Sequence, residues 1–182
     1  MYRGSNPIAR TSQQNIADAL VRLLQRMPYS SITISAICRE ADVSRQTFYS
    51  LFSSRENIVL YLLDTCHTFE PGKECHSTLS LRVLSQEYAS YLIDKRELLS
   101  LLQQNALIYL LHGSLYDSFM NCSCFLPGQN APRRAFCSEF IAGGLSGIAK
   151  IYVQEGTGLS KEALTETIRS LFSGELFPRE DC

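Results

Sequence analysis

The chain has 182 residues, of which 45% are hydrophobic and 19% are charged, with a formal net charge of −1. This composition is typical of a globular protein, excludes wholesale disorder and provides no overall positive field. No uninterrupted apolar run approaches the roughly 18 residues of a membrane-spanning helix, and the N-terminus lacks the apolar stretch of a signal peptide. We therefore expect a soluble, cytoplasmic protein with no membrane partner and with free thiols at its seven cysteines.

Charge is distributed unevenly along the chain. Residues 1–56 contain seven arginines and four acidic residues, whereas residues 57–182 contain ten basic and fourteen acidic residues. A basic N-terminal part is compatible with an anionic partner, but chance alone also produces a difference of this size. The charge pattern therefore leaves both interpretations open.

Helical spacing of apolar residues begins near the N-terminus. Thr11 and Gln14 fit a capping box, so we expect the first helix to begin at Thr11 and to end before Pro28. The apolar residues of this segment share one predicted face: Ile16, Leu20, Leu23, Leu24 and Met27.

Short segments with N-cap residues come next. Thr33 precedes the segment 34–41, and Ser44 precedes the segment 45–52. Ser53 and Glu56 fit a second capping box that opens a fourth helix. Each of these segments is therefore predicted to begin directly after its capping residue.

The rest of the chain is also predicted to be helical. Helical periodicity marks the segments 79–94, 95–102, 106–121, 133–155 and 160–173, and no alternating strand pattern is present. We expect an all-α protein of about nine helices. A three-helix N-terminal domain is predicted for residues 1–55 and a helical C-terminal domain for residues 56–182.

The two short helices in succession are the most informative pattern. Helices of this length are unstable alone, so tertiary packing must hold them in place. The candidate core residues of the pair are Ile34, Ile37, Ala41, Val43, Phe48 and Phe52. This packing leaves polar side chains facing outward at the start of the second helix, which is helix-turn-helix geometry suited to the DNA major groove. The alternative is a plain helical hairpin with a solvated polar face.

The polar residues of this segment suit DNA recognition. Arg45 can pair in bidentate fashion with guanine, and Gln46 can do so with adenine. Other hydroxyl and cationic groups nearby can contact the phosphate backbone. The predicted DNA-binding residues are Thr33, Ser44, Arg45, Gln46, Thr47, Tyr49 and Arg55.

The sequence from Ala41 onward, Ala-x-Val-Ser-x-x-Thr-Phe-Tyr-x-x-Phe, followed by Ser54-Arg55-Glu56, resembles the DNA-binding domain of TetR/AcrR-type bacterial regulators. The resemblance covers residues 10 to about 65. It implies a homodimeric regulator of an inverted-repeat DNA operator, a repressor by default, whose C-terminal domain senses a small molecule or a partner protein. Two positions differ from the family pattern: Asp42 replaces the usual turn Gly, which Asp tolerates, and Arg55 replaces a phosphate-contacting Lys.

A second resemblance concerns the C-terminal part. Residues 91–99 and 140–148 resemble a Firmicute-type subgroup that includes regulators of dihydroxyacetone kinase operons. This implies an alternative function, activation of a kinase-type metabolic operon. A helical adaptor that no longer reads DNA is another alternative. We expect no enzyme and no cofactor, because the sequence has no phosphate-binding Gly-rich loop, His-Glu-x-x-His motif or nucleophile elbow.

Three glycines cluster in the predicted helix 133–155. Gly143, Gly144 and Gly147 each cost about 0.5–1 kcal/mol relative to Ala in a helix, so a close approach to another helix is expected there. That helix belongs either to the same chain or to a second copy. The family resemblance implies a second copy, bound through the last two long helices. The predicted dimer interface consists of Ile141, Gly144, Leu145, Ile148, Tyr152, Leu164, Ile168 and Leu171.

Candidate ligand sites are weakly marked in the sequence. Aromatic and polar-tipped residues of the C-terminal part suggest a pocket for a small-molecule effector, although they also suit a core or a surface. These residues are Tyr88, Tyr91, Tyr109, His112 and Phe119.

Cysteine chemistry offers two further possibilities. The pairs Cys66-His67 and Cys75-His76 provide soft metal ligands, but their spacing matches no standard zinc module, and we predict no metal site. Cys122 and Cys124 suit redox sensing only if a thiol there has a lowered pKa.

Overall fold

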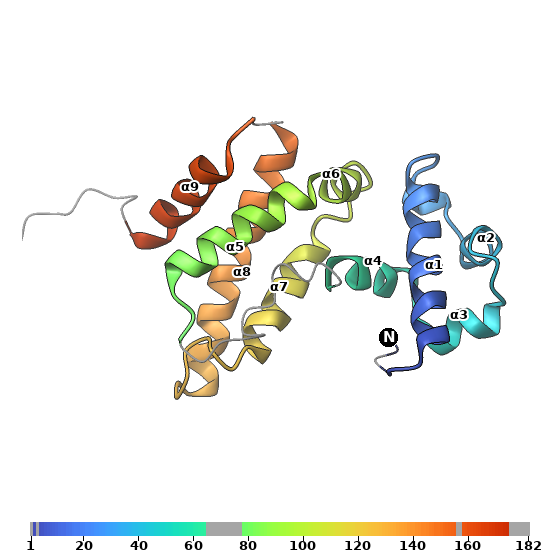
Figure 1. Cartoon of the computed structure of the whole chain (residues 1–182), viewed down its shortest axis with the longest axis horizontal. Helices are drawn as coiled ribbons and strands as arrows, with labels where there is room; N and C mark the ends of the chain where they lie inside the picture. The colour runs from blue at the N-terminus through green and yellow to red at the C-terminus, as the bar shows by residue number, and fades with distance from the viewer. Residues whose placement is uncertain (1, 3, 65–77, 156–157, 175–182) are drawn as a thin grey trace, which may run out of the picture.

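The computed structural model describes residues 2, 4–64, 78–155 and 158–174 (Figure 1). Every regular element in these ranges is helical, which confirms the all-α prediction with its nine α-helices. The helices are α1 (Pro7–Leu24), α2 (Ile34–Glu40), α3 (Arg45–Leu51), α4 (Arg55–Asp64), α5 (Leu81–Asp94), α6 (Arg96–Gln104), α7 (Leu110–Asn121), α8 (Ala131–Gln154) and α9 (Lys161–Ser173), with a short 3-10 helix η1 (Tyr29–Ser31) between α1 and α2.

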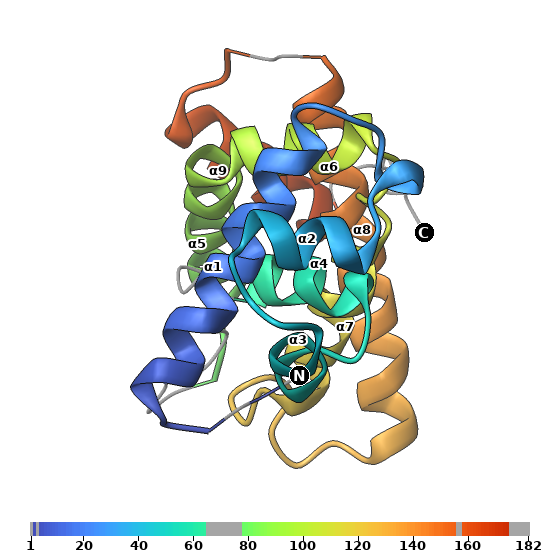
Figure 2. The same ribbon diagram turned by 90° about the vertical axis from the view of Figure 1, so that its right-hand side faces the viewer.

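The helices form two groups connected by α4. The head consists of α1, η1, α2 and α3, and the body consists of α5 to α9 (Figure 1). Helix α4 packs against α1 of the head and against α7 of the body, while α8 packs against α6 and α7, and α5 against α9. Helices α2 and α3 lie on the side of α1 that faces away from the body (Figures 1 and 2). The division of the chain at residues 55 and 56 stays a prediction.

Helix α1 begins earlier than its sequence pattern indicated. Asn6 is the N-cap, and its Oδ1 accepts a hydrogen bond from the Ile8 N–H at 3.0 Å. Pro7 occupies the first helical position, where its missing N–H costs nothing. The capping box predicted at Thr11 and Gln14 is therefore wrong; the Thr11 hydroxyl instead donates to the Pro7 carbonyl at 3.0 Å.

The caps of the two short helices are confirmed. The side-chain oxygens of Thr33 and Ser44 accept hydrogen bonds from backbone N–H groups three residues on, at 3.1 and 2.9 Å. Asp42, in the turn between α2 and α3, has a φ of 53°, the left-handed conformation expected where the family has Gly. The cap predicted at Ser53 is wrong, because Ser54 Oγ accepts the hydrogen bond from the Asn57 N–H.

Both groups of helices are built around apolar cores. The fully buried side chains of the head and of α4 include Ile16, Leu20, Ile37, Phe48, Phe52 and Ile58. Those of the body include Tyr88, Leu92, Leu99, Leu102, Phe119, Leu145 and Ile168. Two residues predicted for the core, Ile34 and Val43, are only half-buried. Met27, predicted for the apolar face of the first helix, lies beyond the end of α1 and is exposed.

Helix α8 differs from the prediction that no segment is long and apolar enough to span a membrane. Its 24 residues reach a mean hydropathy of 1.2 over an 18-residue window, which by length and composition suffices to cross a membrane. It contains no long uninterrupted apolar run, because Ser, Gly and charged residues separate its apolar ones. Only 28% of that window is buried, and the exposed residues of α8 include Phe136, Phe140 and Ile151.

Candidate nucleic-acid interface

Helix α3 presents a polar face to solvent over an apolar base. Phe48 and Leu51 are buried, and the Phe48 ring also contacts Phe52. The predicted base-reading residues Arg45, Gln46 and Tyr49 are exposed, Tyr49 by 59%. This alternation follows from the 3.6-residue helical period, which turns every third or fourth side chain inward. The structure therefore brings these predicted residues together on one accessible surface.

Side chains at the start of α3 are held by local hydrogen bonds. Ser44 Oγ lies 2.8 Å from Thr47 Oγ1, and an Nη2 hydrogen bond connects Arg45 to the Ser35 hydroxyl of α2. Arg45 thus lies across the gap between α2 and α3 while remaining exposed. Such anchoring reduces the entropy that the guanidinium loses when it binds a partner.

Arg55 has a different environment from the other predicted DNA contacts. It is half-buried, and its Nη1 donates to the carbonyls of Tyr29, at 3.1 Å, and Ile32. Its guanidinium also stacks over the Tyr29 ring, 4.5 Å from the centroid. These contacts fix η1 against α4. Part of the guanidinium is therefore already occupied within the chain. The predicted phosphate contact of Arg55 stays a prediction.

Tyr29 connects the head to α4 and to the body, a role that sequence patterns did not indicate. Its hydroxyl donates to Glu56 Oε1 at 2.7 Å, and its backbone N–H donates to Asn105 Oδ1 of the body at 3.1 Å. Burial, followed by the hydrogen bond to Glu56, raises the Tyr29 pKa well above its usual value. The hydrogen bond from Tyr29 lowers the pKa of the Glu56 carboxyl. No signal in the sequence could have found these partners, which are 27 and 76 residues away.

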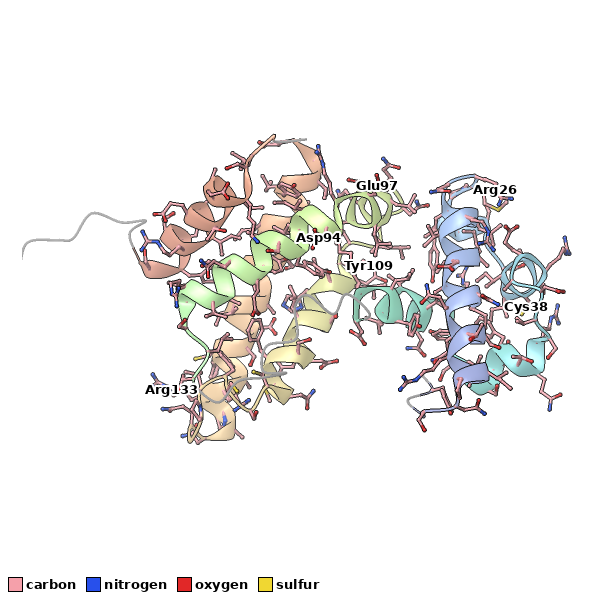
Figure 3. The ribbon with its side chains drawn as sticks, viewed as in Figure 1. Arg26, Cys38, Asp94, Glu97, Tyr109 and Arg133 are labelled. Atoms are coloured by element: carbon pink, nitrogen blue, oxygen red, sulfur yellow. The ribbon has the colours of Figure 1, made fainter. Side chains whose placement is uncertain are left out.

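The arginines of the head are not equivalent. Arg22 and Arg26 bind Glu40 at 2.8 and 2.9 Å, and these two hydrogen bonds lower the pKa of the Glu40 carboxyl. Figure 3 shows Arg26 at the C-terminal end of α1, the end away from α3. By contrast, Arg39 and Arg45 are exposed on α2 and α3. Glu40 therefore offsets charge on Arg22 and Arg26, whereas Arg39 and Arg45 present positive charge at the surface of α2 and α3.

The predicted dimer interface needs correction. Leu145, Tyr152, Leu164 and Ile168 are buried inside their own chain, so these side chains have no surface to offer a second copy. Four others are half-buried: Ile141, Gly144, Ile148 and Leu171. A Cβ on Gly144 would lie 2.7 Å from Cζ of Phe172, so this glycine permits the close approach of α9 within the chain.

A different face of α8 is exposed and apolar. Phe136, Phe140 and Ile151 are 78%, 72% and 51% exposed, and a Cβ on Gly143 or Gly147 would meet open space. These five residues, which we call the α8 face, recur at helical spacing on one side of the helix. The buried members of the predicted interface, such as Leu145 and Tyr152, lie on the opposite, inward side of this helix, and the dimer itself stays a prediction.

The predicted pocket residues do not share one cavity among those outlined by the described residues. Tyr88 and Tyr91 are buried and stacked, with the Tyr88 hydroxyl donating to the Leu145 carbonyl at 2.8 Å. Phe119 is buried against Phe125. Tyr109, at the start of α7, is exposed (Figure 3). His112 Nε2 lies 3.2 Å from a carboxylate oxygen of Glu139 in α8.

The cysteine hypotheses have mixed outcomes. Both Cys-His pairs lie outside the described residues. Within the described ranges, no cluster of three or more His, Cys, Asp or Glu side chains could hold a metal ion. Cys122 and Cys124 are buried, and burial raises the pKa of the Cys122 thiol. A low-pKa redox sensor at Cys122 is therefore wrong.

The N-terminal part of the chain matches the model of a known protein family. Residues 16–62 match the model of bacterial regulatory proteins of the tetR family. No curated protein matches the chain.

Solved structures share the fold of the chain. It is similar to Lin0861 from Listeria innocua, with a TM-score of 0.78 at 14% identity, over 95% of each chain. It is also similar to a TetR transcriptional regulator from Streptococcus agalactiae 2603V, with a TM-score of 0.57 at 17% identity, over 90% of this chain and 94% of that one. A third similar structure is the dihydroxyacetone kinase operon activator DhaS, with a TM-score of 0.55 at 17% identity, over 91% of this chain and 96% of that one.

Proposed function

We infer that this chain, whose residues 16–62 belong to the tetR family of bacterial regulatory proteins, is a ligand-responsive repressor that binds an inverted-repeat operator as a homodimer. The family assignment confirms the resemblance noted from the Ala41 motif, and a DNA-binding transcriptional regulator follows from it. Repression, the homodimer and the operator are proposals.

The observation that carries the proposal is the outward face of α3. Arg45 and Gln46 are exposed at its first turn, and the helix is seated on the buried Phe48 ring. A recognition helix held in this way enters the major groove with its N-terminal side chains toward the base edges. Arg45 then contacts guanine and Gln46 contacts adenine. Thr47 and Tyr49 flank them, while Thr33, Ser44 and Arg55 are the proposed backbone contacts.

The α8 face supports the proposed homodimer. Phe136, Phe140 and Ile151 form an apolar stripe that a second α8 would cover, and Gly143 and Gly147 would let two backbones approach closely. A two-fold symmetric pair presents two α3 helices to half-sites about one DNA turn apart, or somewhat more. Joining two heads also raises the apparent affinity, because the second contact becomes intramolecular. A regulator of this kind is expected to be soluble, with the apolar stripe buried between copies.

Activation is the second candidate function, because the similar structure DhaS is an operon activator. Repression acts by occupancy and needs no contact with polymerase. A reporter gene controlled by the operator separates the two: deletion of the regulator raises expression under repression and lowers it under activation.

A selection from random double-stranded DNA tests the proposed function. The purified chain is expected to enrich an inverted repeat and to bind it with an affinity that falls steeply as salt concentration rises, because phosphate contacts release counterions. A chain that enriches no sequence and shows no salt-dependent DNA binding would instead be an adaptor that has lost DNA recognition.

A further inference from the structure

An apolar cavity of about 380 Å³ lies at the junction of α5, α8 and α9, away from the head. Leu81 and Leu84 of α5 form one wall, and Cys137 and Ile141 of α8 form another. Phe172 of α9 closes one side. A volume of this size falls within the usual range of small-molecule sites.

The walls of this cavity are fixed by contacts within the chain. The Leu79 N–H donates to the Cys124 carbonyl at 2.9 Å, which holds the start of α5 against the loop that carries Phe125. Gly144 gives Phe172 the space to lie against α8, where its ring meets Phe140 edge-to-face at 6.1 Å between centroids. The cavity is thus formed before any ligand arrives.

The lining restricts the chemistry of the occupant. Among the described residues that line the cavity none is charged, and the polar side chains are one hydroxyl, from Ser80, and one thiol, from Cys137. The Ser80 hydroxyl already caps α5 by accepting from the Val83 N–H. Burying an ionised group without a partner is costly, so a carboxylate or an ammonium is disfavoured here. The favoured occupant is uncharged and largely apolar.

The cavity adjoins the proposed contact between copies. Phe136 and Phe140 line its mouth and also belong to the α8 face. Its inner wall includes Leu84 and Phe125, which are 5% and 7% exposed. An occupant must therefore reach below the surface, which a small molecule does and a flat helix from a second copy does not.

We propose that this cavity is the effector site and that its ligand is an uncharged, apolar small molecule. Ligand binding acts on the rest of the protein through the Phe136 and Phe140 side chains at the α8 face. The regulatory role of this site rests on the proposed function, whereas binding of the ligand to the cavity does not. A ligand that alters these two rings changes the packing of the copies and hence the spacing of the heads. By linkage, it must bind one arrangement better than the other.

A fluorescence titration with 1-aminoanthracene, an uncharged aromatic probe, tests the site. The Cys137→Trp variant places a large side chain in the cavity and is expected to weaken probe binding by about tenfold or more, a loss of about 1.4 kcal/mol. Ala131→Trp, at an exposed position on the same helix outside the cavity, is the matched control and should bind as the wild type does. Anthracene-1-sulfonate, the anionic counterpart, should bind the wild type more weakly than the neutral probe.

A second measurement uses the wild-type chain and so avoids any folding defect of the variant. Alkylation of Cys137 by iodoacetamide, followed by peptide mass mapping, is expected to slow as the probe saturates, while alkylation of Cys38 in the head stays unchanged. Equal alkylation of Cys137 with and without the probe, or equal probe binding by Cys137→Trp, would overturn the proposal. One probe bound per pair of chains would also overturn it, by placing the probe between the copies.

Operator binding is measured separately on the same proteins. Cys137→Trp should still bind operator DNA, because the cavity is remote from α3. Failure of the wild type to bind any DNA would refute the proposed function and leave the result on the cavity standing.

Discussion

Replacing Tyr29 with Phe tests how the head is attached to the rest of the chain. The change removes one hydroxyl, which donates to Glu56 at 2.7 Å. It leaves the ring that stacks on Arg55, and it keeps the backbone N–H that donates to Asn105. The substitution therefore isolates one hydrogen bond to a carboxylate at the junction of η1 and α4.

The magnitude follows from that geometry. A hydrogen bond to a charged group contributes about 1.5–3 kcal/mol when buried. Tyr29 and Glu56 are both half-buried, so solvent screening reduces the expected loss in the free energy of unfolding to about 1–2 kcal/mol. For a chain of this size, such a loss lowers Tm by about 2–8 °C.

The same hydrogen bond makes a prediction about pH. The pKa of Glu56 is lower in the folded chain than its ordinary value of 4.5, chiefly because of Tyr29. A depressed folded-state pKa stabilises the fold above the unfolded-state value, and that stabilisation is lost as pH falls through the folded-state value. The difference between wild type and Tyr29→Phe should therefore be complete at neutral pH and shrink as pH falls below 4.5.

Urea unfolding followed by circular dichroism, at neutral pH and at acidic pH, measures both effects. A double-mutant cycle with Glu56→Gln separates the pairwise interaction from the other contacts of each residue. Equal stability of wild type and Tyr29→Phe at neutral pH would refute the reasoning, as would a loss that does not depend on pH.

Three further tests use substitutions at other positions. Gly113→Ala, at an exposed and uncrowded position of α7, should stabilise the chain by about 0.5–1 kcal/mol, whereas Gly144→Ala should not, because its Cβ would contact a ring of α9; thermal unfolding of both variants checks this. Phe140→Glu should yield a monomer in sedimentation experiments, while Tyr109→Glu, at another exposed aromatic residue outside the α8 face, should remain a dimer; a dimeric Phe140→Glu would place the seam elsewhere. Arg55→Lys should lower stability by about 1–3 kcal/mol without changing the salt dependence of DNA binding, and unchanged stability would contradict its structural role.

Local features of the head could be predicted from the sequence because local interactions determine them. Thr33 and Ser44 cap helices through bonds to residues three positions away, and Asp42 adopts the turn conformation that its short polar side chain tolerates. Apolar spacing likewise identified the buried rings Phe48 and Phe52. Such features depend on a few neighbouring residues, so a single sequence suffices.

Features that depend on distant packing could not be predicted in this way. The apolar residues of α8 lie on two faces, and the sequence contains no signal for which face contacts α7 and which is exposed. Leu145 and Phe140 are both apolar, yet one is fully buried and the other is 72% exposed. Arg55 resembled a phosphate ligand from its position in the motif, but its guanidinium also binds the carbonyls of Tyr29 in η1 and of Ile32 directly after it. The cavity is likewise formed by segments that are distant in sequence.

The most direct test of the central claim is a binding titration of the enriched operator and a scrambled sequence at several salt concentrations. Arg45→Ala is compared with Arg82→Ala, which removes the same charge from an exposed position on α5. The account predicts that Arg45→Ala loses about 1–3 kcal/mol on the operator, much less on the scrambled sequence, and that Arg82→Ala binds both like the wild type. Equal losses for Arg45→Ala on the two sequences would show that α3 does not read bases through this residue.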